Sequence, residues 1–333
     1  MASQAISTLE NENLLAHAIS LPKDGAWTNW LDSVEPLDLS WKNLIYGPDS
    51  KLISFMLNAT NKSVITPLML KLMEKSDSEK CCLCGAPKCT LFHILVNCKE
   101  SLEQKRYTWR HDSILATLQP ILLSHIQQHN ESRNESQNQP SVLLDHFIRE
   151  GDVKNWKSKK LQASNLLKKA FDWELLVDFD CKNIIFPPFI CATNMRPDIV
   201  LFSRSSCQVI LLELTCPAEE NINKAQDRKI AKYLELQELI KNSSKDAWSS
   251  KLFTIELGAR EFVANSVRKC LRSLGIPSRV VSTTCRAVSM VSARCSYAIW
   301  LKHNTTYWEY STELNHLVTI PVLSDENNNN NNL

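Results

Sequence analysis

The chain has 333 residues, 44% of them hydrophobic and 22% charged, with a net charge of +2. This is the composition of an ordinary globular protein, and so small a net charge leaves nucleic-acid binding to local basic patches. With only 6 glycines, the sequence has no phosphate-binding loop of the P-loop or dinucleotide type. It shows neither a signal peptide nor an apolar run long enough to cross a membrane. We therefore expect an intracellular protein whose 12 cysteines are reduced.

The N-terminal part of the sequence is predicted to contain helices rather than strands. Residues 1–36 show no clear periodicity and are interpreted as an N-terminal extension. Residues 37–75 have a helical pattern with breaks near Gly47-Pro48 and before Pro67. We interpret this segment as a helical linker region.

A cysteine cluster follows at residues 81–98. Four of its residues have the order and spacing of zinc ligands, namely Cys81, Cys84, His93 and Cys98. Zinc takes four nitrogen or sulfur ligands in a tetrahedron, and a site closed by protein ligands is structural. Cys82 and Cys89 leave other ligand registers open, and reduced cysteines without a metal are the alternative. We predict a zinc knuckle that forms a unit with the helix after it, at residues 76–126.

The C-terminal half alternates predicted strands and helices, which favours an α/β layer. A polar segment at residues 127–150, which contains Pro140, is predicted to be a linker. The domain after it spans residues 151–320 and begins with a basic stretch, Lys154 to Lys169. Its predicted strands lie at 196–202, 209–215 and 252–257, and its predicted helices at 222–241, 261–274 and 286–302. The asparagine-rich tail, 321–333, is predicted to be disordered.

Each of the first two predicted strands of this domain carries one carboxylate. Asp198 lies near the start of the first strand, and Glu213 near the end of the second. A charge within so apolar a run is costly to bury unless it is paired or binds a metal. Magnesium takes oxygen ligands and often needs only one or two carboxylates, so the pair predicts a shared magnesium site. The alternative is a structural ion pair with Arg196, Lys224 or Arg228.

Four stretches of the chain resemble the C-terminal part of a non-LTR retrotransposon polyprotein, in the branch whose reverse transcriptase is followed by a CCHC zinc knuckle and a restriction-like endonuclease. They are Trp41–Leu44 with Ser63–Pro67, the knuckle, Arg106–Asp112, and Arg196-Pro197-Asp198 with Glu213-Leu214-Thr215 and Arg228–Tyr233. The resemblance covers residues 37–302, and the polymerase is missing, because no Tyr/Phe-x-Asp-Asp motif occurs. It implies a restriction-endonuclease-like mixed sheet of the PD-(D/E)xK type, flanked by helices and preceded by a mostly helical lobe with the knuckle.

The same resemblance implies a lysine beside the two carboxylates, displaced into the helix at 222–241. The usual position of that lysine, two residues after Glu213, is Thr215. Lys229 and Lys232 share one helix face with three apolar residues, Ala225, Leu236 and Ile240. Lys232 precedes Tyr233 and so matches the Lys-Tyr pair of the family, which ranks it above Lys229. The alternative is that both lysines extend along the rim of the helix.

Cationic and aromatic side chains alternate in the string that follows the knuckle. Four of them suit phosphate contact and base stacking, namely Arg106, Trp109, Arg110 and His111. Trp109 could instead pack the knuckle against its helix. We also expect Arg196 and Tyr233, next to the candidate catalytic residues, to contact nucleic acid.

The predicted function is magnesium-dependent DNA nicking by Asp198, Glu213 and a lysine, in a retrotransposon-derived protein that holds structural zinc. The implied partners are DNA, element RNA and a reverse transcriptase acting in trans, without a membrane, and the nucleus is the expected location. The alternative is a catalytically inactive, zinc-dependent nucleic-acid-binding protein derived from the same kind of element.

Overall fold

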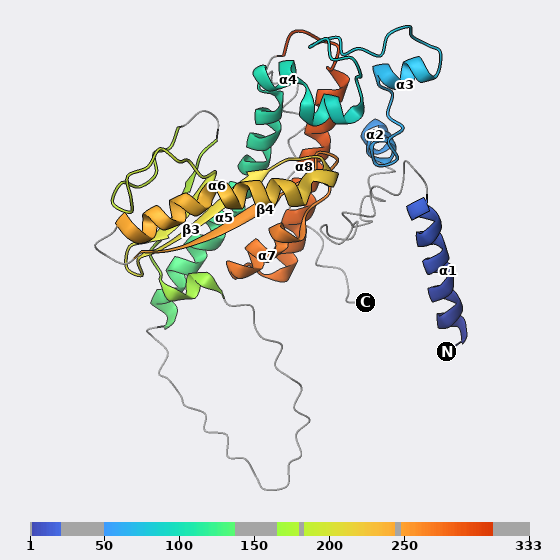
Figure 1. Ribbon diagram of the computed structural model, residues 1–333. Coiled ribbons are helices and arrows are strands. Elements are labelled where there is room, and N and C mark those ends of the chain that lie inside the picture. Colours follow the sequence, from blue (N-terminus) through green and yellow to red (C-terminus); the bar gives the residue numbers. More distant parts are fainter. Residues whose placement is uncertain (1, 21–49, 137–164, 180–182, 244–247, 309–333) are drawn as a thin grey trace, which may run out of the picture.

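The computed structural model describes residues 2–20, 50–136, 165–179, 183–243 and 248–308 (Figure 1). The helices are α1 (Ala2–Ser20), α2 (Ser50–Thr60), α3 (Pro67–Leu72), α4 (Lys99–Glu103), α5 (Arg106–Ser136), α6 (Ile222–Ser243), α7 (Asn265–Ser273) and α8 (Ser278–Leu301). The strands are β1 (Trp173–Val177), β2 (Ile199–Ser203), β3 (Gln208–Thr215) and β4 (Ser249–Glu256). Three single turns are η3 (His93–Asn97), η4 (Leu166–Lys169) and η5 (Glu219–Asn221). None of the helices in these ranges is apolar over enough of its length to cross a membrane.

The four strands form one mixed sheet in the order β1-β2-β3-β4. The pairs β1–β2 and β2–β3 are antiparallel, and β3–β4 is parallel. Every residue of β2 is buried, as is every residue of β3 after Gln208. Strands covered on both faces read as continuous apolar runs, which is the pattern that predicted them. The α/β class is therefore confirmed, as a mixed sheet flanked by helices.

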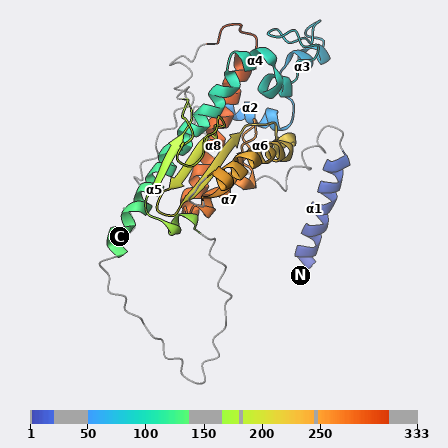
Figure 2. The same cartoon turned by 60° about the vertical axis from the view of Figure 1, so that its left-hand side comes forward.

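The two faces of the sheet pack against different helices (Figures 1 and 2). Ile199 and Leu201 of β2 point into a core shared with α5, α7 and α8. Val200 and Phe202 point the other way, into a core shared with α6. Side chains of a strand alternate between faces, so this division also places Glu213 of β3 on the α6 side.

The knuckle and the sheet share one continuous core, although the sequence predicts two separate units. Cys81 and Cys98 belong to the same buried cluster as Ile114 and Leu118 of α5 and as the inner residues of the sheet. The helix α5 has 31 residues and packs on both β1 and α8. The segment at 76–126 is therefore part of the same folded body as the sheet.

The linker predicted at 127–150 is wrong in its first part, because α5 continues to Ser136. The polar residues that suggested a linker instead bind the chain beside β1. His129 Nε2 lies 2.8 Å from the carbonyl oxygen of Leu167, and Asn130 makes two hydrogen bonds to the backbone of Trp173, at 2.9 and 3.2 Å. Polar composition alone does not distinguish such side chains from solvated ones.

Other predicted elements shift at their ends. The predicted helix at 286–302 begins earlier, at Ser278, and the one at 261–274 begins later, at Asn265. The strand β1 and the helix α1 were not predicted; the side chains of residues 6–14 in α1, among them Ile6, Leu9 and Leu14, are all exposed. Of the basic stretch, only Lys168 and Lys169 lie in the described ranges, in η4. The segments 21–49, 137–164 and 309–333 lie outside the described residues.

Glu261, in the loop between β4 and α7, is buried with a backbone φ of +90°. Its Oε2 has no hydrogen-bond partner among the described residues. Burial, together with the nearby charge of Glu219, raises the pKa of Glu261 to about 8. The folded state therefore keeps the carboxyl proton to a higher pH than the unfolded chain does.

We expect the free energy of unfolding to fall as pH rises from about 4.5 to about 8, because only the folded state holds the Glu261 proton there. Each pH unit in this window is worth about 1.4 kcal/mol per group. Glu261→Gln should reduce the slope without abolishing it, because the pKa values of Glu213 and Glu256 are also raised. Urea unfolding at several pH values measures this, with the exposed Glu235→Gln as control. An unchanged slope in Glu261→Gln would contradict the assignment.

Candidate functional site

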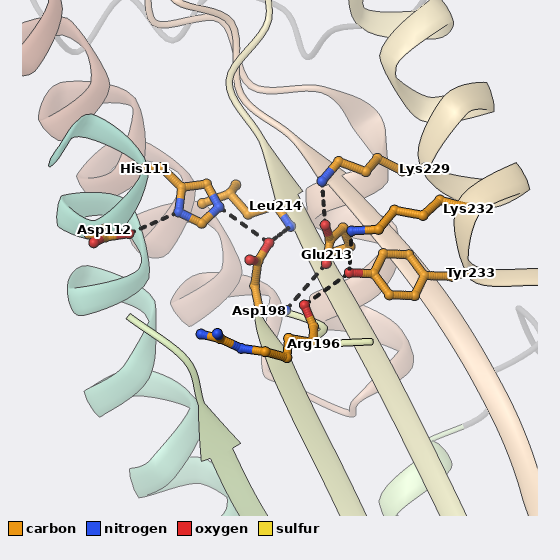
Figure 3. Close-up of polar contacts among 9 residues, drawn as sticks. All are labelled: His111, Asp112, Arg196, Asp198, Glu213, Leu214, Lys229, Lys232 and Tyr233. Atoms are coloured by element: carbon orange, nitrogen blue, oxygen red, sulfur yellow. Dashed lines mark hydrogen bonds and ion pairs between the residues drawn. The ribbon is translucent and has the colours of Figure 1, made fainter. Parts of the chain in front are cut away.

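The two candidate carboxylates lie side by side at one end of the sheet (Figure 3). Ile199 pairs with Leu212, so the residue before β2 stands opposite Glu213 of β3. The backbone N–H of Asp198 donates to Glu213 Oε2 at 3.3 Å, and the N–H of Leu214 donates to Asp198 Oδ2 at 2.7 Å. Antiparallel pairing thus brings together the two carboxylates that the sequence singled out.

Glu213 sits in an environment that disfavours its charge. Only 2% of the residue is exposed, and burial followed by the charge of Asp198 raises the pKa of its carboxyl, with Lys229 opposing the shift. Two carboxylates this close repel each other, and a bound cation would relieve that repulsion. The electrostatics are those of a site that favours a cation.

The lysine that reaches the carboxylates is Lys229, so the predicted ranking of Lys232 above Lys229 is reversed. Lys229 Nζ forms an ion pair with Glu213 Oε1 and is partly buried. Lys232 is exposed, and its Nζ donates to the hydroxyl of Tyr233 at 3.1 Å. The reason is helical phase: at 3.6 residues per turn, the position one turn after 229 falls nearer to 233 than to 232. Tyr233 takes the inward position and is fully buried.

Tyr233 is buried beside the site and holds the backbone of Arg196. The Tyr233 hydroxyl donates to the carbonyl oxygen of Arg196 at 3.0 Å, which fixes the backbone two residues before Asp198. Because Tyr233 is buried, the prediction that it contacts nucleic acid is wrong. The Arg196 guanidinium forms an ion pair with Asp178 at 2.6 Å and stays partly exposed, so its contact with nucleic acid remains a prediction.

The string after the knuckle is buried, which corrects three more predicted nucleic-acid contacts. Arg106 is 0% and Arg110 1% exposed. Arg106 donates to the carbonyl oxygens of Lys302 and Thr305 at 2.7 and 2.6 Å, and Arg110 donates to Ser296 Oγ at 3.0 Å and to the Cys216 carbonyl oxygen at 3.3 Å. Trp109 packs edge-on against Trp308. These side chains tie α5 to α8 and to the chain after it, and leave no surface for phosphate or bases.

His111 differs from its neighbours, because it reaches the carboxylate site. Its Nε2 lies 3.2 Å from Asp198 Oδ2, and its Nδ1 lies 3.1 Å from Asp112 Oδ1 (Figure 3). Burial lowers the pKa of His111, but the hydrogen bonds to Asp112 and Asp198 outweigh it and hold the pKa well above the usual value. The contact with Asp198 joins positions 87 residues apart, so no local sequence motif predicts it.

A cleft of about 540 Å³ opens beside the carboxylates, between the knuckle and α6. Its lining includes Lys224, Arg228 and Lys229 of α6, with His111 of α5 opposite. Among the described residues that line it, none is acidic. Phe92 of the knuckle stands at the cleft and is 45% exposed. The charged side chains of the lining would therefore favour an anionic group.

The knuckle residues form a compact cluster that could bind a zinc ion. The ligand atoms of Cys81, Cys84, His93 and Cys98 all lie within 4.8 Å of one another. Cys81 and Cys98 have their sulfurs 3.9 Å apart, and Cys84 Sγ lies 3.3 Å from His93 Nε2. Tetrahedral zinc with its ordinary bond lengths would place two sulfurs roughly 3.8 Å apart and a sulfur and a nitrogen roughly 3.5 Å apart. The four residues therefore fit the ion.

The backbone around the cluster is arranged to hold it. The Gly85 N–H donates to the Cys81 carbonyl oxygen at 2.9 Å, in a tight turn where Gly85 has a φ of +71°. Burial lowers the pKa of His93, which favours the neutral imidazole that a metal needs. Cys82 is exposed and Cys89 is buried, and both lie outside the set of four. The four clustered residues are the ones that the sequence predicted as ligands.

No protein-family model matches this chain, and no match to a curated protein was found. The function is therefore argued from the site itself.

Proposed function

We propose that this chain is a magnesium-dependent DNA endonuclease that nicks one strand, with a restriction-like arrangement of catalytic groups. The observation that carries the proposal is the adjacency of Asp198 and Glu213, with Lys229 on Glu213 and the cationic cleft beside them. The order of the chain, Pro197-Asp198, Glu213 and then a lysine from the next helix, is that of the PD-(D/E)xK resemblance.

Each group has a distinct part in the proposed reaction. Asp198 and Glu213 would hold the magnesium ion, which, when bound, neutralises charge on the scissile phosphate and lowers the pKa of a bound water. Lys229 would turn from Glu213 toward the phosphate and stabilise its developing negative charge. Lys224 and Arg228 line the cleft and would bind the neighbouring phosphates. With the ion bound, the negative charges of the two carboxylates would be offset, so they would not repel the DNA strand.

The zinc cluster has a structural part in this proposal. Four protein ligands leave no open position, which is the pattern of a structural rather than a catalytic zinc. The shared core of knuckle, α5 and sheet means that zinc would stabilise the framework on which the nuclease site is built.

The resemblance also leads us to propose a retrotransposon origin. It makes nuclear DNA and element RNA the partners to test first, with a reverse transcriptase supplied in trans. Neither the RNA nor the reverse transcriptase is needed for the nicking reaction itself.

Nicking of supercoiled plasmid by the zinc-loaded full chain tests the proposal. We expect open circles with Mg²⁺ and none with a chelator that removes Mg²⁺. The alternative is a nucleic-acid-binding protein without catalysis, which the lysine and arginine side chains that line the cleft would also support. Salt-sensitive DNA binding without nicking in Mg²⁺ or Mn²⁺ would establish that alternative instead.

The two lysines of α6 should have very different effects on cleavage. Lys229→Ala should lower the rate about a hundredfold or more, because it removes the cation next to the carboxylates. Lys232→Ala is the matched control on the same helix and should change the rate less than about threefold, because its side chain is exposed. Single-turnover cleavage at saturating DNA measures both. A larger loss in Lys232→Ala than in Lys229→Ala would return the catalytic role to Lys232.

A further inference from the structure

Asp198 presents its two oxygens differently to the protein. Its Oδ2 accepts the backbone N–H of Leu214 at 2.7 Å and lies 3.2 Å from His111 Nε2. Within the described part of the chain, no hydrogen-bond donor is found on Oδ1. A carboxylate held through one oxygen by two donors keeps a fixed orientation, and its other oxygen stays available for a cation.

The imidazole that holds Oδ2 is itself held in place. Asp112 contacts the opposite ring nitrogen of His111 at 3.1 Å, which orients the ring toward Asp198 (Figure 3). One turn earlier on α5, the Tyr107 hydroxyl donates to the Ile94 carbonyl oxygen at 2.9 Å and accepts the Cys98 N–H at 3.0 Å. The first turns of α5 are therefore fixed to the knuckle on one side and to Asp198 on the other.

We infer that His111 is a positioning residue for the divalent cation: it holds Asp198 Oδ2 so that Oδ1 faces the metal. The inference rests on the proposed magnesium site and adds to it a residue from the helix after the knuckle. Hard divalent cations take oxygen ligands, so the imidazole acts on the cation through the carboxylate rather than as a ligand. Partners that orient a metal ligand commonly contribute 10- to 100-fold, by order of magnitude, to metal affinity.

Binding of Mn²⁺ to the zinc-loaded full chain, followed by the loss of the free-ion electron paramagnetic resonance signal, tests the inference without requiring catalysis. His111→Ala should weaken Mn²⁺ binding about tenfold or more. His111→Asn should behave alike, because its amide is too short to reach Asp198. His111→Gln places an amide N–H near the position of Nε2 and should restore binding to within about threefold. Asp198→Asn identifies the site, since it should remove the same Mn²⁺.

The metal dependence of cleavage provides a second measurement. In His111→Ala, the Mg²⁺ concentration for half-maximal rate should rise about tenfold, while the rate at saturating Mg²⁺ recovers to near that of the wild type. A merely structural role would lower the saturated rate or the melting temperature in all three variants. If His111→Ala fails to fold, the Asn and Gln variants carry the comparison.

Four outcomes separate this inference from the proposed function. Equal Mn²⁺ affinity in wild type, His111→Ala and His111→Asn would overturn the inference alone. Tighter Mn²⁺ binding in every variant would also overturn it, because it would mean that the imidazole opposes the cation. Weaker binding in the Ala and Asn variants, rescued by Gln, in a chain that never cuts DNA would support the inference and refute the endonuclease. If Asp198→Asn removed no Mn²⁺ site that the wild type has, both the inference and the proposed function would be overturned.

Discussion

Replacing either candidate metal ligand, by Asp198→Asn or Glu213→Gln, should abolish DNA nicking while leaving DNA affinity within about threefold of the wild type. The two side chains meet at one end of the sheet, and each would supply an oxygen to the same magnesium ion. Removing one carboxylate weakens the binding of the ion and with it the stabilisation of the transition state, which lowers the rate roughly a hundredfold or more. Binding should persist, because the cationic cleft residues Lys224 and Arg228 remain.

Plasmid nicking and a DNA-binding titration on the same preparations measure the two effects separately. Glu235→Gln on the exposed side of α6 is the matched control, because it removes one solvent-exposed carboxylate and should cut normally. Thermal unfolding should show that Asp198→Asn and Glu213→Gln are folded. Full nicking by either variant would mean that the catalytic site lies elsewhere.

Removing a knuckle ligand should destabilise the whole folded body, not only a peripheral lobe. Cys84→Ser should lose the bound zinc and lower the melting temperature by about 10 °C or more, at roughly 2–4 °C per kcal/mol for a protein of this size. The loss should spread because Cys81 and Cys98 share a core with α5 and the sheet. We expect a single unfolding transition at the lower temperature.

Metal analysis and calorimetry of the purified chain check this prediction. Cys82→Ser is the control, since Cys82 is exposed and outside the ligand set; it should keep the zinc and the melting temperature. A wild-type protein without zinc would show that the cysteines are simply reduced thiols. A zinc-free Cys84→Ser chain that melts at the wild-type temperature would show that the knuckle does not support the sheet.

The features that the sequence predicts well are those fixed by residues close together in the chain. The spacing from Cys81 to Cys98 is a local property, and the structure gathers those four ligands as expected. The strands β2 and β3 are continuous apolar runs because both faces are buried, and a charge in such a run is conspicuous. One short antiparallel connection then suffices to bring Asp198 to Glu213.

The features decided by the tertiary structure depend on phase and on distant contacts. In the predicted stripe of α6, Ala225, Leu236 and Ile240 are buried as expected, and only one position is wrong. Tyr233 rather than Lys232 turns inward, because a helix repeats every 3.6 residues. An arginine-rich string looks the same in sequence whether it faces solvent or a core. Arg106 is buried where carbonyl groups 196 and 199 residues away accept its hydrogen bonds, together with the neighbouring Gln104 side chain. The same long-range packing brings His111 to Asp198, a contact that no spacing in the chain could indicate.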